Sequence, residues 1–226
     1  MTENQTERHQ WKESAHCHFQ RWAHHYDRTI INYLLFRPCY RRVLIQLRHW
    51  QRRGFDQLRI LDIGCGTGNL LIQSFLYGPK IQSAVGLDMS PNMIEYAQRK
   101  VPVLNLNNRL RFIVGDAEHL PFQDHSFDVI TCCNSFHHYP HQLQALREMF
   151  RVLARDGRLI LIDGYRDDPI GFFIFDVCVA RVENHVHHCS RQRFRDLLAD
   201  AGFARIYQHV FGITPPAIMN IAYADK

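Results

Sequence analysis

Residues 61–69, with the sequence LDIGCGTGN, constrain the fold more than any other segment of the chain. An apolar run ends in an aspartate, and Gly64, Gly66 and Gly68 then alternate with other residues. Glycines at this spacing let the backbone and the amides of a following helix approach a ligand directly. We therefore predict a strand that turns tightly around a cofactor. The dinucleotide fingerprint G-x-G-x-x-G fits less well, because its third glycine would fall at Asn69.

A second strand-like run, residues 83–88, ends in Asp88, 20 residues beyond Gly68. An acid is expected at this position when a fold of this kind binds a ribose. Its carboxylate can accept from both ribose hydroxyls, whereas the alternative role, a helix cap before Pro91, needs only one backbone donor. Both roles can hold for the segment, since Ser90 with Pro91 makes the better cap. We expect Asp88 to bind the sugar.

Further runs of β-branched and aromatic residues predict the other strands. We expect strands from about residue 58 and over 110–117, 127–134 and 157–163, alternating with amphipathic helices over 90–100 and 141–153. This alternation predicts an α/β fold with a doubly wound, mostly parallel sheet that binds its ligand at the carboxyl edge. After a helix over 191–201, two runs over 204–211 and 217–224 are joined through Pro215 and Pro216 and would close the sheet as an antiparallel hairpin.

In these motifs, residues 58 to 165 resemble the class I S-adenosylmethionine-dependent methyltransferases, and within them the ubiquinone/menaquinone-biosynthesis C-methyltransferases. The resemblance implies a Rossmann-like, seven-stranded sheet with an antiparallel C-terminal strand, and S-adenosyl-L-methionine as the cofactor. It also implies that the glycine loop wraps the methionine part and that Met89 flanks the adenine. Asp116 and Ala117 would bind the adenine amine and ring, and Asn134 would face the amino-acid end. The predicted cofactor-binding residues are Asp62, Gly64, Cys65, Gly66, Gly68, Asp88, Met89, Asp116, Ala117 and Asn134.

Methyl transfer from a sulfonium depends mainly on positioning the acceptor and excluding water, and it needs a base only when the acceptor carries a proton. His137 and His138 follow the fourth predicted strand, at the carboxyl edge, and an imidazole titrates in the useful range. We favour His138 as the base, against the alternative that a histidine here only braces the loop. Tyr26, on the N-terminal helix, resembles a family feature that covers the cofactor and is the third catalytic candidate.

The predicted domain organisation is one methyltransferase domain, residues 56–226, preceded by residues 1–55. We expect residues 1 to about 15 to be disordered and helices over roughly 17–33 and 38–52 to cover the site. Residues 165–190 are too long for a plain connection and carry Phe172, Phe173 and Phe175. This insertion is the predicted substrate cover, although its aromatic residues could equally pack the helices onto the sheet.

The densest basic segment, Arg37 to Arg53, contributes to a net charge of +5. Its apolar positions 43, 44, 47 and 50 follow a helical period, which favours an amphipathic helix over a nucleic-acid or membrane surface. No apolar run is long enough to span a membrane and no nucleic-acid module is present, so we expect a cytoplasmic protein with a small-molecule acceptor and leave a homodimer open. Seven scattered cysteines favour reduced thiols.

Two histidine–cysteine clusters, at residues 16–18 and 185–189, offer metal-ligand side chains. Neither has a standard zinc spacing, so we expect surface histidines and no metal site. The chain is thus predicted to methylate a small aromatic or apolar acceptor at carbon or oxygen. The alternative is a non-catalytic protein that binds S-adenosylmethionine as a sensor or scaffold.

Overall fold

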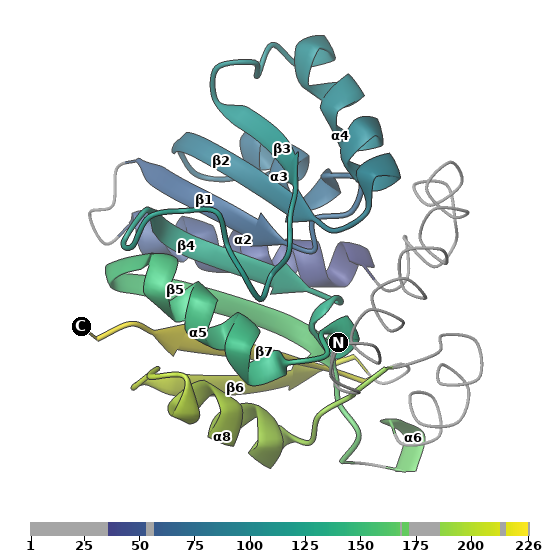
Figure 1. The fold of residues 1–226 in the computed structure, drawn as a ribbon, viewed down its shortest axis with the longest axis vertical. Helices are drawn as coiled ribbons and strands as arrows, with labels where there is room; N and C mark the ends of the chain where they lie inside the picture. The colour runs from purple at the N-terminus through teal and green to yellow at the C-terminus, as the bar shows by residue number, and fades with distance from the viewer. Residues whose placement is uncertain (1–35, 53–56, 168, 172–185, 213–215, 226) are drawn as a thin grey trace, which may run out of the picture.

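The computed structural model describes residues 36–52, 57–167, 169–171, 186–212 and 216–225, which contain a seven-stranded sheet in the order β3-β2-β1-β4-β5-β7-β6 (Figure 1). All neighbouring strands are parallel except β7, which is antiparallel to both β5 and β6. The predicted fold class is therefore confirmed. The strands are β1 (Leu58–Ile63), β2 (Ile81–Asp88), β3 (Leu110–Val114), β4 (Phe127–Cys133), β5 (Leu153–Gly164), β6 (Ile206–Phe211) and β7 (Ala217–Tyr223).

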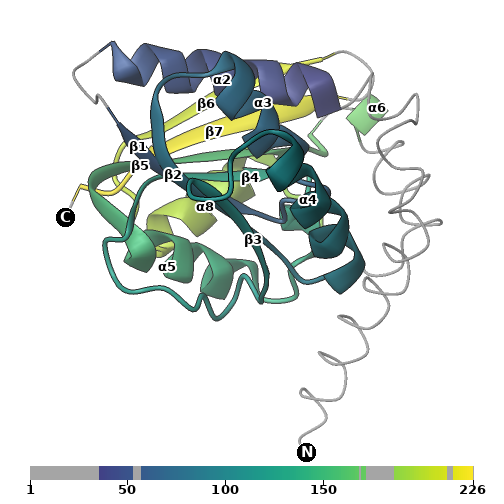
Figure 2. The same ribbon diagram turned by 90° about the horizontal axis from the view of Figure 1, so that it is seen from above.

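Helices cover both faces of the sheet, as Figures 1 and 2 show. One core cluster joins α2, α3 and α4 to one face, and a second joins α5 and α8 to the other. The adjacent Cys132 and Cys133 fall into opposite clusters, as the period of a strand requires. The helices are α2 (Arg37–Gln51), α3 (Asn69–Tyr77), α4 (Pro91–Val103), the 3₁₀ turn η2 (Phe136–His138), α5 (Gln142–Val152), the short α6 (Pro169–Gly171) and α8 (Arg191–Asp200).

The basic segment forms α2, as its period predicted. Val43, Leu44, Leu47 and Trp50 are buried, and Val43, Leu47 and Trp50 belong to the core cluster on this face of the sheet. The Arg42 guanidinium lies 4.1 Å from the centroid of the Phe211 ring, so an arginine at the edge of the apolar face also packs on the sheet. The structure thus supports a docked amphipathic helix.

Two predicted strand boundaries differ from the observed ones by three residues or more. β3 ends at Val114, three residues early, because the Gly115 amide bonds to the Asp88 carbonyl and the chain then turns. β5 begins at Leu153, four residues before the predicted start, and an irregular register opposite β4 accommodates the extra residues. The extra residues include Asp156, whose backbone turns with φ +57°. The hydrophobic period of the sequence does not reveal such a turn.

Several predictions fall outside the described residues. These are the N-terminal tail and first helix, Tyr26, and the aromatic residues of the predicted substrate cover. Among the described residues no helix is long and apolar enough to cross a membrane. The cytoplasmic location and the homodimer stay predictions.

Candidate functional site

The loop between β1 and α3 forms the tight turn that its glycines predicted. The amides of Gly64 and Cys65 both bond to the Leu87 carbonyl at the end of β2, at 2.8 and 3.1 Å. A Cβ on Gly68 would lie 2.3 Å from the Phe112 ring, whereas a Cβ on Gly66 would meet nothing within 4 Å, although its φ of +52° still favours glycine. Gly68 therefore serves packing, and Gly66 faces open space that a ligand can use.

A cavity that opens to solvent lies beside this loop. Its volume, with the solvent space at its mouth included, is about 970 Å³. Its walls come from the ends of β1, β2 and β4, from the turn after β3, and from Phe36 and Tyr40 at the start of α2. Eight of the ten predicted cofactor-binding residues line it, and Asp62 and Gly68 do not. The eight are Gly64, Cys65, Gly66, Asp88, Met89, Asp116, Ala117 and Asn134.

Asp88 links the glycine loop to the following helix. One carboxylate oxygen accepts from the Gly66 amide at 2.8 Å, and the other accepts from the Ser90 amide at 2.9 Å. Ser90 caps α4 through the Met93 amide, as predicted, but it does not release Asp88 from the helix start. Each carboxylate oxygen offers about two acceptor sites, so one backbone bond to each oxygen does not by itself prevent Asp88 from accepting from a ligand.

Asn134 follows β4 in a left-handed conformation, with φ +54°. Its backbone amide bonds to the Ile162 carbonyl at 2.8 Å, but its buried Nδ2 makes no hydrogen bond within the residues that the structure describes. The Cys39 thiol of α2, a weak acceptor at best, lies beside it. A buried donor that is poorly satisfied costs up to about 1–3 kcal/mol, so a ligand oxygen would be a better acceptor for this amide than the thiol.

Asp62 lies behind the glycine loop, where it is 2% exposed, and it accepts a hydrogen bond from the Thr131 hydroxyl at 2.6 Å. Burial, with a smaller contribution from the Asp88 charge, raises the pKa of Asp62 to about 7. This carboxyl therefore supports the loop from within the core. It is protonated in a large fraction of molecules near neutral pH.

The turn after β3 places Asp116 and Ala117 at the cavity. The Asp116 carboxylate accepts from the Glu118 amide at 3.0 Å, and the buried Glu118 accepts from the His141 amide at 2.9 Å. Glu118 also lines the cavity and was not predicted. In the sequence, only the position of Glu118 two residues after Asp116 could have indicated that it lines the cavity.

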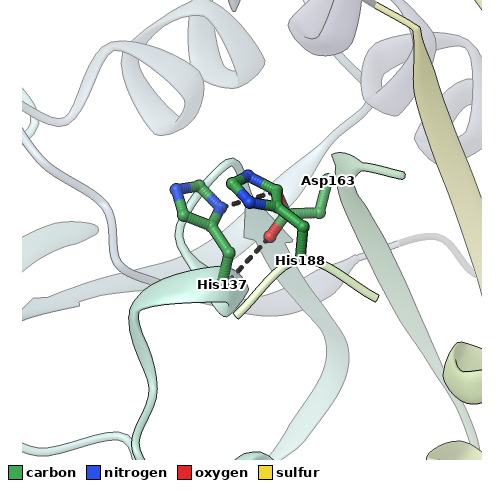
Figure 3. Close-up of side chains that lie close together, drawn as sticks. All are labelled: His137, Asp163 and His188. Atoms are coloured by element: carbon green, nitrogen blue, oxygen red, sulfur yellow. Dashed lines mark hydrogen bonds and ion pairs between the residues drawn. The ribbon is translucent and has the colours of Figure 1, made fainter. Parts of the chain in front are cut away.

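The two candidate histidines of η2 have different surroundings. His138 lines the cavity, whereas His137 is buried beneath it and contacts Asp163 and His188 (Figure 3). The expectation of surface histidines is wrong for His188, which is 9% exposed and packs on His137 through a contact distant in sequence. Sequence reasoning also missed several residues at or beneath the cavity, namely Phe36, Tyr40, Ser135, Tyr139 and Asp163.

The cysteines that the structure describes have thiol pKa values raised by burial. Burial raises the pKa of the Cys65 thiol well above its ordinary value. The five cysteines within the described residues are all free. Cys65 thus contributes a small side chain to the cavity wall.

Comparisons with known proteins agree with the geometry. A methyltransferase-domain family model matches residues 61–161. A demethylmenaquinone methyltransferase of Lactiplantibacillus plantarum is 33% identical over 188 residues, which cover 71% of this chain and 78% of that protein. An uncharacterized methyltransferase, YcgJ, of Bacillus subtilis is 37% identical over 136 residues, which cover 60% of this chain and 48% of that protein.

The crystal structure of Bacillus subtilis YcgJ has the same fold, with a TM-score of 0.64, 24% identity and coverage of 76% of this chain and 93% of that one. In sequence, the chain spans between 42 and 63% of the length of four of its curated relatives. The family predicted from the motifs is confirmed, together with the cofactor that the family uses. The chain belongs to the class I S-adenosylmethionine-dependent methyltransferases, of the type that includes the ubiquinone/menaquinone biosynthesis C-methyltransferases.

Proposed function

We propose that this protein transfers a methyl group from S-adenosylmethionine to a small aromatic or apolar acceptor, at carbon or oxygen. The observation that carries the proposal is a cavity that the Asp88 carboxylate, the open side of Gly66 and Asn134 line together, with the Asn134 Nδ2 buried beside no stronger acceptor than the Cys39 thiol among the described residues. This combination suits a ligand with a carboxylate at one end and a ribose further along.

The residues of the cavity fit this cofactor. Gly66 leaves room for the methionine part, and the Asn134 amide would donate to its carboxylate. Asp88 would accept from the ribose hydroxyls, and Met89, Asp116 and Ala117 would contact the adenine. The bound cofactor supplies an electrophilic methyl group on a sulfonium.

His138 is the residue that we propose as the base. As a neutral imidazole at the cavity wall, it would take the proton that the acceptor loses when its oxygen or carbon forms the new bond to the methyl group. The apolar side chains of Phe36, Met89 and Met93 in the same walls would exclude water.

The acceptor class rests on two observations. The walls of the cavity carry aromatic and methionine side chains, which suit an apolar ring. Several relatives are named demethylmenaquinone methyltransferase, which supports an aromatic acceptor by analogy.

The test is methyl transfer from labelled S-adenosylmethionine to a panel of quinols, phenols and amines, with the wild type and with His138→Gln. We expect the wild type to methylate a quinol or phenol and the variant to lose roughly two to four orders of magnitude in turnover. Binding of S-adenosylhomocysteine and the melting temperature should stay near the wild-type values.

His209→Gln is the matched control, because His209 is exposed on β6 and is not part of the cavity wall. Wild-type turnover in His138→Gln would reject this residue as the base, and a loss that matches a lower melting temperature would mean that it only braces the loop. A wild type that methylates nothing, but changes its affinity for a protein partner when the cofactor binds, would favour the sensor or scaffold alternative.

A further inference from the structure

A buried group of three side chains lies directly behind His138. It consists of His137 from η2, Asp163 near the end of β5, and His188 from the segment before α8 (Figure 3). The His137 ring is in contact with both other imidazoles, at 4.1 Å from the His138 centroid and 4.5 Å from the His188 centroid. The group therefore connects the cavity wall to the interior of the molecule.

Asp163 holds His137 at two points. One carboxylate oxygen accepts from Nδ1 of His137 at 2.6 Å, and the other accepts from the His137 backbone amide at 3.0 Å. The first oxygen also accepts from the Gly164 amide at 2.8 Å. These bonds fix both the ring and the backbone of the residue that precedes His138.

The Asp163 carboxylate is charged although it is 1% exposed. Burial by itself would raise its pKa, but the His137 charge and hydrogen bond, with His188 and the Gly164 amide, outweigh burial and lower the pKa below its ordinary value. A buried anion needs a counterion, and the His137 imidazole lies 2.6 Å from the Asp163 carboxylate. The pair is therefore best described as carboxylate and imidazolium.

His188 completes the group as a neutral ring. Burial, followed by the charge of His137, lowers the pKa of His188 to about 3. Its ring is stacked on that of His137 with an angle of 16° between the planes. Ring nitrogens bind a metal in the plane of the ring, so stacked rings in these orientations do not direct two nitrogens at one ion, although the three side chains are of metal-binding types.

We infer that Asp163 and His137 are positioning residues for His138: the ion pair fixes the turn that presents His138 to the cavity, and its cationic member, in ring contact with His138, keeps that imidazole neutral. This inference rests on the proposed function of His138 as the base. A fixed positive charge beside an imidazole disfavours its protonation, so His138 would be held in the form that can accept a proton.

Other charged groups surround the three rings. Arg166 and His187 act on the His188 side of the group. Asp88, Asp116 and Glu118 line the cavity that His138 also faces. These charged groups are unchanged in the variants used in the test, so a change in the titration of His137 or His138 can be assigned to the ion pair.

The test is an NMR titration of the assigned histidine rings in the full chain, which needs no acceptor. In the wild type, the protonation midpoint of His137 should lie above that of an ordinary histidine, and the His188 ring should stay neutral down to about pH 4. In Asp163→Asn, the His137 midpoint should fall by more than about one pH unit, and the His138 midpoint should rise by roughly half a unit to one unit.

Asp128→Asn is the matched control. Asp128 also accepts from a backbone amide and a cationic side chain, both of Arg59, but it lies at the opposite end of the neighbouring strand β4. This variant should lower the melting temperature and leave the His137 and His138 midpoints unchanged. With an acceptor that the wild type methylates, only Asp163→Asn should move the acidic limb of the pH–rate profile to higher pH. The affinity for the cofactor should stay within about twofold of the wild-type value.

A wild-type His137 that titrates at or below the ordinary histidine value would overturn the inference, and this measurement stands even if Asp163→Asn does not fold. A His138 midpoint that is the same in the wild type and Asp163→Asn would overturn it as well. If no acceptor is methylated, the proposed function fails, whereas the ring titrations still decide the ion pair.

Discussion

Asp88 is the residue on which the cofactor assignment depends most. Hydrogen bonds to a charged acceptor contribute roughly 1.5–3 kcal/mol each, so loss of the bonds to both ribose hydroxyls should weaken binding strongly. We expect Asp88→Ala to raise the dissociation constant of S-adenosylmethionine at least about tenfold in a calorimetric titration. Asp88→Asn, which can retain one acceptor oxygen, should lie between this variant and the wild type.

Part of that loss could come from the glycine loop, because Asp88 also holds the Gly66 amide. The Asp62→Asn variant controls for loop support, since Asp62 lies behind the loop and outside the cavity wall. If Asp88→Ala bound the cofactor and S-adenosylhomocysteine as tightly as the wild type, the ribose assignment would be wrong.

Asp62 should make the stability of the protein depend on pH. Its pKa is raised from 3.8 to about 7 in the folded state, chiefly by burial, so the folded state binds more protons than the unfolded state between these values. Its contribution is therefore fully present below about pH 4 and is lost as the pH rises through 7. Urea unfolding of the wild type and Asp62→Asn from pH 4 to 8 should show the wild type losing stability relative to the variant. A constant difference would contradict the raised pKa.

At the scale of elements, the turn between β1 and α3 contains two glycines with different roles. Gly66 faces space that a ligand can use, whereas Gly68 is required by the packing of the fold. Ala at position 66 would meet no neighbouring atom but would sit at φ +52°, which costs about 1–2 kcal/mol. We expect Gly66→Ala to lower the melting temperature modestly and to abolish the stabilisation by S-adenosylhomocysteine. Gly202→Ala, at φ +106° after α8, should lower the melting temperature and keep the stabilisation. If S-adenosylhomocysteine stabilised Gly66→Ala and Gly202→Ala equally, the ligand would bind outside the turn between β1 and α3.

The elements themselves were largely predictable, because each has a local period. The α2 stripe of Val43, Leu47 and Trp50 and the runs that became β1, β2 and β4 appear directly in the sequence. Contacts between distant segments do not. Asp163 ends a predicted strand, but its bonds to His137 depend on β4 and β5 lying side by side, and His188 comes from the last residues of the insertion.

For the whole molecule, the fold alone does not distinguish a methyltransferase from a dinucleotide enzyme, because both use a parallel sheet with a glycine turn. The difference lies at Asn69, the first residue of α3, where the dinucleotide fingerprint needs its third glycine. Lys100 of α4 donates to the Asn69 side chain at 3.0 Å and to the Thr67 carbonyl at 2.9 Å. The start of α3 is thus tied to α4 by side chains at the position where the dinucleotide fingerprint has a glycine for close packing of the helix on the strand.

The ligand preference of the intact protein should follow from this difference. At about 100 times its dissociation constant a ligand stabilises the folded state by about 2.7 kcal/mol, which corresponds to a rise of roughly 5–10 °C in the melting temperature of a chain of this size. We expect S-adenosylmethionine and S-adenosylhomocysteine to produce such a rise in a thermal-shift titration, and nicotinamide dinucleotides at equal concentration to produce less than about 1 °C. Gly66→Ala should respond to none of them, which would place the effect in the cavity. The opposite ranking would mean that the glycine turn binds a pyrophosphate and that the chain departs from its family in the cofactor that it uses.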